Sequence, residues 1–117
     1  MSMSRSLWAL SALLIPTADA LAQSQTGIAS YYWQGQRTAN GERFNTMAHT
    51  CAHRTLPFGT MLRVTNLRNG ASTTCRVNDR GPFIRGRIVD LSTAGARQIG
   101  MVASGIVPVR IEVVGRR

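Results

Sequence analysis

The stretch on either side of Asn69-Gly70 constrains the fold of this chain more than any other, because it encodes a β-hairpin. Asn-Gly is the favoured dipeptide of a two-residue hairpin turn, and the flanking segments alternate between apolar and polar residues. Pairing outward from this turn, Leu62 faces Val77 and Val64 faces Cys75, and these four residues share an apolar face. The opposite face is polar and consists of Arg63, Thr65, Thr74 and Arg76. The pattern therefore predicts a hairpin with Cys75 directed into a core.

Other segments have the composition of short strands separated by glycine and asparagine turns. Residues 27–33 and 88–91 combine apolar, β-branched and aromatic residues. Residues 92–99 predict a short helix that begins after Ser92 as N-cap and ends at Gly100. A last strand is indicated by apolar residues that alternate with more polar ones, namely Val107, Val109, Ile111 and Val113. We therefore expect a mostly β domain, a small six-stranded barrel with one short helix.

The N-terminal segment has the pattern of a signal peptide. Arg5 supplies a positive start, residues 7–15 form an apolar run, and Pro16 breaks this run before an Ala-Leu-Ala cleavage site at 20–22. A buried N-terminal helix is the alternative, but the run is too short to span a bilayer, which takes roughly 20 apolar residues. No cysteine lies near the cleavage site, so no lipid anchor is expected. We predict a signal peptide over residues 1–22 and one exported domain over residues 23–117, soluble in the periplasm or secreted.

The chain contains two cysteines, Cys51 and Cys75. In the oxidising compartment that a signal peptide implies, such a pair predicts a disulfide. It would close a loop of roughly 25 residues, for which chain entropy gives about 3 kcal/mol of stabilisation. The alternative is a pair of unlinked, buried thiols.

The charge is strongly positive, with a net charge of +9, and every basic side chain is an arginine. A basic surface favours acidic partners. The arginines are spread along the chain rather than clustered, and an exported protein rarely meets nucleic acid, so we do not expect a nucleic-acid partner. Anionic polymers of the cell envelope fit the compartment better. The alternative is that arginine usage reflects genome composition only.

Acidic residues are scarce after the predicted cleavage site, which makes each of them informative. They are Glu42, Asp79, Asp90 and Glu112, and each has the structural alternative of a carboxylate paired with an arginine. Glu112, in mid-strand on the polar face, fits that alternative, and Asp90 suits the start of a helix. Asp79 lies at a strand end before Gly81-Pro82, where strand parity directs it inward at the mouth of the barrel. A half-buried carboxyl at this place is a candidate general acid.

The two histidines, His49 and His53, have the i, i+4 spacing of metal ligands on a helix. The intervening residues do not favour a helix, and the glutamate of a metalloprotease motif is absent, so we expect neither a metal site nor a cofactor. His53 is a candidate hydrogen-bonding residue of the site, with a buried structural histidine as the alternative.

Six motifs occur together in order: Gly-Ile-Ala-Ser-Tyr-Tyr at 27–32, Arg-Thr-Ala-Asn-Gly-Glu at 37–42, Ala-His-Arg-Thr-Leu-Pro-Phe-Gly-Thr at 52–60, Arg-Val-Thr-Asn at 63–66, Val-Asn-Asp-Arg-Gly-Pro-Phe at 77–83 and Ile-Val-Asp-Leu-Ser at 88–92. With these motifs the chain resembles the rare lipoprotein A (RlpA) family over residues 27–114. The resemblance implies a double-psi β-barrel, a fold shared with expansins. It also implies lytic transglycosylase activity on peptidoglycan, with a preference for glycan strands stripped of their stem peptides.

The resemblance assigns candidate catalytic positions to Asp79 and His53, with Glu42 in the Asn-Gly-Glu motif. Such enzymes cleave the MurNAc–GlcNAc β-1,4 bond without water, because the MurNAc 6-hydroxyl closes on C1. The departing oxygen needs a proton and the 6-hydroxyl must lose one, and a carboxyl group can do either. Asp79 is expected to be the principal acid/base, and Asp90 the second candidate, because expansins have an important aspartate in a similar sequence. We further predict that substrate is bound by residues of these motifs, namely Tyr32, Asn40, Arg80 and Asp90.

Two other functions fit the same features: a non-catalytic, expansin-like glycan-binding module, and a secreted inhibitor or virulence protein. The motifs favour the enzyme. We further expect endolytic cleavage and a monomeric state. Many family members carry a lipid-anchor cysteine, and many carry a C-terminal SPOR domain that binds stem-free glycan at the division septum. Neither is seen in this sequence, so septal targeting is left open.

Overall fold

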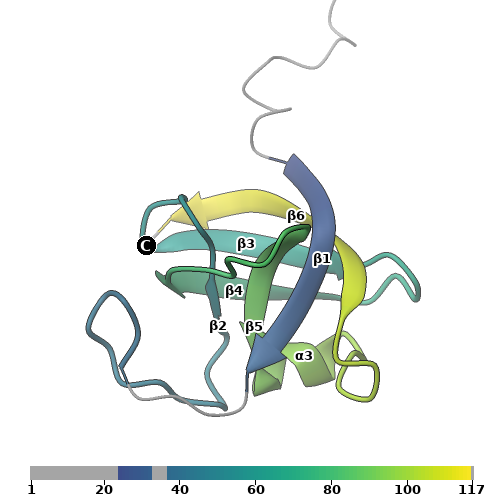
Figure 1. The fold of residues 1–117 in the computed structure, drawn as a ribbon, viewed down its shortest axis with the longest axis horizontal. Helices are drawn as coiled ribbons and strands as arrows, with labels where there is room; N and C mark the ends of the chain where they lie inside the picture. Colours follow the sequence, from purple (N-terminus) through teal and green to yellow (C-terminus); the bar gives the residue numbers. More distant parts are fainter. Residues whose placement is uncertain (1–23, 33–36, 117) are drawn as a thin grey trace, which may run out of the picture.

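The computed structural model describes residues 24–32 and 37–116, which form a closed barrel of six strands with one short helix (Figure 1). The predicted signal peptide lies outside the described residues. In chain order the elements are β1 (Ser24–Tyr32), β2 (Thr50–Ala52), β3 (Thr60–Asn66), β4 (Ser72–Asp79), β5 (Arg87–Ser92), α3 (Thr93–Gln98) and β6 (Val107–Arg116).

The strands follow one another around the barrel in the order β1-β5-β2-β4-β3-β6. Two pairs are parallel, β1 with β5 and β2 with β4, and the other pairs are antiparallel. Strands far apart in sequence therefore lie side by side, as β1 does between β5 and β6 (Figure 1). This interleaving confirms the predicted mostly β, double-psi barrel with one short helix.

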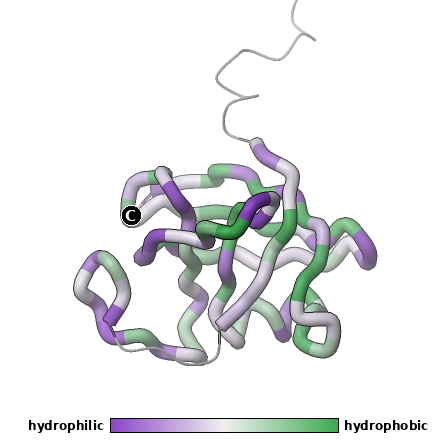
Figure 2. Tube along the Cα trace, viewed as in Figure 1, coloured by the Kyte–Doolittle hydropathy of each residue, from purple (hydrophilic) through white to green (hydrophobic). Residues whose placement is uncertain are grey.

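Every second residue along a strand points inward, and these inward residues fill the barrel interior. Along β3, Leu62 and Val64 are fully buried while Arg63 is exposed, and β6 repeats the pattern with Val109 and Ile111. Apolar and hydrophilic residues alternate along the strands, and hydrophilic residues gather at the tip of the β3–β4 hairpin (Figure 2). Period-two patterning thus positions the core as predicted.

The β3–β4 hairpin differs from its prediction in register. Leu62 lies opposite Cys75 and Val64 opposite Thr73, because the loop spans residues 67–70 instead of two residues. The amide side chains explain the longer loop: Asn66 Oδ1 accepts from the backbone N–H of Arg68 (2.9 Å), and Asn69 Oδ1 accepts from that of Ala71 (2.9 Å). The shift is by two residues, so the predicted faces are kept.

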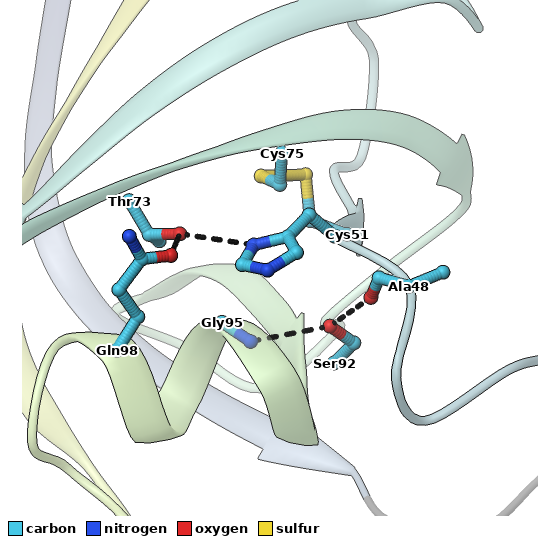
Figure 3. The surroundings of a disulfide bond; sticks show 8 residues. Ala48, Cys51, Thr73, Cys75, Ser92, Gly95 and Gln98 are labelled. Carbon is cyan, nitrogen blue, oxygen red and sulfur yellow. Dashed lines mark hydrogen bonds between the residues drawn. A yellow bond between two sulfur atoms is a disulfide. The ribbon is translucent and has the colours of Figure 1, made fainter.

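A disulfide joins Cys51 on β2 to Cys75 on β4, as predicted, and both residues are buried (Figure 3). Helix α3 packs close to it. Ser92 is the N-cap, accepting from the N–H of Gly95 (3.4 Å) and donating to the carbonyl of Ala48 (2.6 Å). Through the Ser92 hydroxyl, the start of the helix therefore holds the segment that leads into β2, next to the disulfide.

Candidate active site

Four neighbouring strands bring the candidate site residues to one level of the barrel. Ala52 on β2 pairs with Asp79 on β4 at one side and with Asp90 on β5 at the other. Asp90 in turn pairs with Ser30 on β1. Two carboxylates that are distant in sequence therefore flank a single small residue.

The side chain of Asp79 does not point inward, although the alternation of inward and outward residues along the strand predicted that direction. Cys51 pairs with Val77 and Ala52 pairs with Asp79, so Asn78 is an extra residue at an irregularity of β4. Asp79 is half-buried, as expected, but its carboxylate faces the 37–43 loop: Oδ1 accepts from the backbone N–H of Ala39 (2.8 Å) and from its neighbour's N–H (2.9 Å). The predicted inward direction is therefore wrong, because the irregularity ends the strict alternation.

Asp90 is a half-buried carboxyl with a raised pKa. Burial is the largest cause, and the negative charge of Asp79 adds to it, while the hydroxyl of Ser30 and the charge of Arg87 oppose the rise. Ser30 Oγ donates its hydrogen bond to Asp90 Oδ1. This carboxyl is thus suited to hold a proton at a higher pH than an exposed aspartate.

Tyr32 lies at the end of β1 within the field of both carboxylates. Its pKa is raised, first by burial and then by the charges of Asp79 and Asp90. Its ring packs on Phe44 with a centroid distance of 4.5 Å. Its buried hydroxyl has no hydrogen-bond partner among the described residues, which leaves it able to bind a substrate oxygen.

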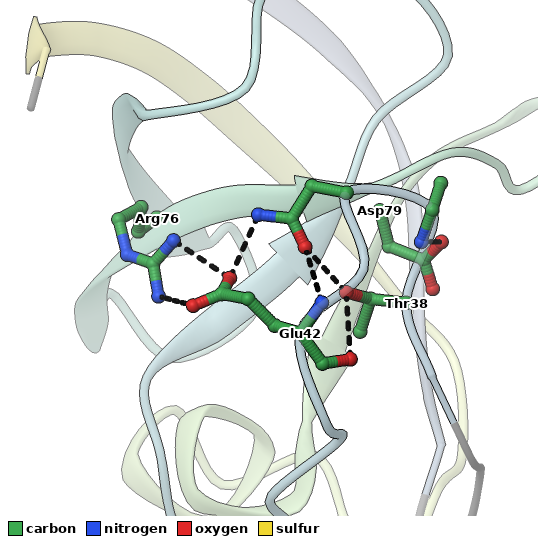
Figure 4. A network of polar contacts seen from close by, with 6 residues as sticks. Thr38, Glu42, Arg76 and Asp79 are labelled. Atoms are coloured by element: carbon green, nitrogen blue, oxygen red, sulfur yellow. Dashed lines mark hydrogen bonds and ion pairs between the residues drawn. The ribbon is translucent and has the colours of Figure 1, made fainter.

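Glu42 is paired with an arginine rather than poised to transfer a proton. Its carboxylate accepts from both terminal nitrogens of Arg76 (2.9 and 3.0 Å) and from the side-chain amide of Asn40 (2.8 Å). The Arg76 hydrogen bonds, followed by that of Asn40, lower the pKa of Glu42 to about 2. Asn40 Oδ1 also accepts from Thr38, so the loop is held as one network beside Asp79 (Figure 4).

His53 is buried directly after β2, and the hydrogen bonds of its ring are with groups other than the Asp79 carboxylate. Nδ1 accepts from the backbone N–H groups of Thr55 (3.2 Å) and Leu56 (3.1 Å), so Nε2 carries the hydrogen and faces Gln25 Oε1 at 3.2 Å. Burial, then the charge of Arg80 and that of Arg54, lower the pKa of His53. Contact with Asp79 is through the backbone, from the His53 N–H to the Asp79 carbonyl (3.2 Å).

Arg80 supports the segment that follows β2. Its Nη1 donates to the carbonyls of His53 (3.1 Å) and Leu56 (2.8 Å), and its guanidinium lies 4.0 Å from the centroid of the Phe58 ring. The structure thus brings together Asp79, Asp90 and Tyr32. The contacts that it gives the side chains of Glu42, Asn40, His53 and Arg80 are with the neighbouring loop and turn.

Sequence reasoning missed two groups of the site. Ser30 lies two residues before Tyr32 on β1, and this spacing on one strand could have suggested it. The N–H of Ala39 holds Asp79 through tertiary contact only, for which the sequence has no signal. Among the described residues no cluster of three or more His, Cys, Asp or Glu could hold a metal ion, and no helix is long and apolar enough to cross a membrane.

Comparisons with known proteins place the chain in a family. Residues 24–111 match the family model described as lytic transglycolase. A probable endolytic peptidoglycan transglycosylase RlpA of Nostoc is 59% identical over 85% of this chain and 28% of its own length. The endolytic peptidoglycan transglycosylase RlpA of Campylobacter jejuni is 53% identical over 86% of this chain and 38% of its own length. The chain therefore spans about a third of the length of these relatives.

Solved structures share the fold at lower identity. The Streptomyces papain inhibitor has a TM-score of 0.66 at 23% identity and covers 80% of this chain and 96% of its own. An expansin of Clavibacter michiganensis has a TM-score of 0.59 at 24% identity and covers 79% of this chain and 50% of its own. These likenesses show the fold alone. By the family model and the curated relatives, the chain belongs to the lytic transglycolase family that includes the RlpA proteins.

Proposed function

We propose that this domain is an endolytic peptidoglycan transglycosylase that acts outside the cytoplasm, as a monomer, on MurNAc–GlcNAc strands free of stem peptides. The names of its relatives support the reaction class. The observation that carries the proposal is the pairing of Ala52 with both Asp79 and Asp90, which puts two carboxyl groups in electrostatic contact but in different surroundings.

In the proposed mechanism the two carboxyls share the proton transfers. Asp90, whose pKa is raised, donates a proton to the departing O4 of GlcNAc as the C1–O4 bond breaks. Asp79, oriented by the Ala39 N–H, accepts the proton of the MurNAc 6-hydroxyl as the C1–O6 bond forms. Its negative charge also stabilises the oxocarbenium-like transition state. The products are a 1,6-anhydro-MurNAc end and a free GlcNAc 4-hydroxyl, and no water is consumed.

The other motif residues have supporting roles in this proposal. Glu42 keeps the 37–43 loop folded against Arg76, and that loop supplies the N–H that orients Asp79. His53 shapes the turn after β2 through Nδ1. Tyr32 has a free hydroxyl beside the carboxylates and binds a sugar oxygen. Glu42 and His53 are therefore positioning residues, which refines the roles that the resemblance implied.

The test is product analysis with purified stem-free glycan strands. We expect the chain to generate anhydro-MurNAc ends by mass spectrometry, and the Asp79→Asn and Asp90→Asn variants to lose roughly 100-fold or more of the rate. Glu112→Gln is the matched control, because Glu112 lies on the barrel surface beside Arg110 and away from the site. Bound but uncleaved glycan with all variants would contradict the enzyme and favour the expansin-like binding module.

A further inference from the structure

A pocket of about 470 Å³ adjoins the carboxylate pair without including it. It lies between the start of β1, the turn after β2 and the start of β5, and it is lined by Gln25, Thr26, His53, Arg54, Thr55 and Ile88. Ile88 and Asp90 are both half-buried on β5, on either side of the buried Val89, so they share its outer face. They lie about 7 Å apart along the strand, so the pocket opens close to the proposed point of cleavage.

Arg54 gives this pocket a fixed positive charge. Its Nε donates to the carbonyl of Pro82 (2.7 Å), and its Nη2 donates to those of Ile84 (3.2 Å) and Arg87 (2.8 Å). Three backbone contacts hold the guanidinium in one place, while no hydrogen bond within the described residues engages Nη1. An arginine that is immobilised before binding loses little entropy when it meets an anion.

No carboxylate of the described residues neutralises Arg54. Glu42 is paired with Arg76 and Glu112 with Arg110, while Ser30 donates to Asp90. Asp79 accepts from backbone N–H groups. The positive field of Arg54 reaches the neighbouring imidazole, where it helps to lower the pKa of His53. The pocket therefore has an uncompensated positive potential.

The remaining lining completes a site for a carboxylate on a short apolar arm. The Nε2–H of His53 donates to Gln25 Oε1, which leaves the side-chain N–H groups of Gln25 as hydrogen-bond donors. Thr26 and Thr55 add hydroxyls, and Ile88 supplies an apolar wall. The glycan has one group of this form: the lactyl substituent of MurNAc carries a methyl and a carboxyl. The stem peptide blocks that carboxyl as a neutral amide, and its removal leaves an anion.

We propose that the Arg54 pocket is the subsite that binds the free lactyl carboxylate of MurNAc and so selects strands without stem peptides. The inference rests on the proposed function, because it assumes a peptidoglycan substrate and identifies the lactyl carboxylate as the group that this chain recognises. Arg54 and the donors around it bind the carboxylate. The apolar wall of Ile88 contacts the lactyl methyl group. A stem peptide removes the charge and adds bulk at the same atom.

The experiment compares the affinities of three glycans, measured by equilibrium binding: strands with free lactyl carboxylates, the same strands with those carboxylates converted to primary amides, and strands with intact stem peptides. We expect the wild-type chain to bind the free-carboxylate strands roughly tenfold or more tightly than the amidated ones. Intact strands should bind as weakly as the amidated ones, although their peptides carry carboxylates. Equal affinity for free and amidated strands would overturn the proposal, and tight binding of intact strands would assign the pocket to a peptide carboxylate instead.

Variants test whether the preference for free carboxylates depends on the Arg54 pocket. Arg54→Gln should remove the preference for free carboxylates, whereas Arg63→Gln, an equal change of charge on an exposed β3 residue, should keep it. Because Arg54 also holds the 82–87 loop, Thr55→Asp is the second test: it adds a negative charge at an exposed lining position and leaves the Arg54 contacts intact. It should weaken binding of the free-carboxylate strands and leave amidated strands unaffected. Equal losses with Arg54→Gln and Arg63→Gln would show a general charge effect only.

The binding measurement does not depend on cleavage. A preference for free carboxylates without anhydro products would support the subsite and refute the enzyme. Anhydro products without that preference would support the enzyme and refute the subsite.

Discussion

At the scale of single residues, the local environment separates carboxyl groups that are chemically alike. Glu42 meets a guanidinium and an amide, which keep its pKa at about 2. Asp90 meets a desolvated surface and a second carboxylate, which raise its pKa. The partners of the first favour its anionic form, and the surroundings of the second favour its protonated form. This difference is why we propose Asp90 as the acid.

The Ser30→Ala variant tests the control of Asp90. The Ser30 hydroxyl opposes the rise in the pKa of Asp90, so its removal should raise that pKa further. A general acid is active while protonated, so we expect the alkaline limb of the pH–rate profile to move to higher pH. The measurement is the rate of anhydro-MurNAc formation across pH, with Ser104→Ala as control, since Ser104 donates to the Met101 carbonyl elsewhere. An unshifted alkaline limb would argue against Asp90 as the proton donor.

The Glu42→Gln variant tests the contribution of the loop network to stability. The folded-state pKa of Glu42 is lowered from 4.5 to about 2, so its stabilising effect is present above pH 4.5 and is lost as the pH falls toward 2. The wild type should therefore have the higher melting temperature at neutral pH, and the gap should close in acid. Its size is modest, because the Glu42 side chain is 41% exposed. Thermal unfolding across pH measures the gap, and a gap that stays constant down to pH 2 contradicts this assignment.

At the scale of secondary-structure elements, the disulfide connects two of the four strands that carry the site. It joins β2, which contains Ala52, to β4, which ends at Asp79. Replacing both Cys51 and Cys75 with alanine should lower the free energy of unfolding by about 3 kcal/mol, because the unfolded chain regains the entropy of a loop of sequence separation 24. Denaturant titration of the oxidised wild type and the double variant measures this loss. A difference below about 1 kcal/mol would show that the cross-link adds little beyond core packing.

The elements also show how far the sequence predicts this molecule. Five of the six strands, the N-cap Ser92 and the buried face of the hairpin follow from local patterns, and the structure confirms them, whereas the short strand β2 was not predicted. The hairpin register and the irregularity at Asn78 do not follow, because side-chain contacts and strand pairing across the barrel set them. The candidate site has the same limit: its acids were identified, but the ring direction of His53 depends on backbone donors two and three residues further along.

At the scale of the whole molecule, the charge distribution complements the proposed substrate. The chain has a net charge of +9, yet its described acids are engaged with arginines, hydroxyls or backbone N–H groups. The remaining positive field is general and draws anionic strands toward the surface. The immobilised guanidinium of Arg54 then distinguishes one anion from another at short range.

The interleaved strand order has a consequence for how the chain reaches this state. The neighbours of β1 in the barrel are β5 and β6, so the first strand pairs only with residues from 87 onward. Contacts so distant in sequence make loop closure costly and folding slow. One side of β1 can pair once Arg87–Ser92 is present. Until Val107–Arg116 arrives, the other edge of β1 and one edge of β3 are open to pairing with other chains.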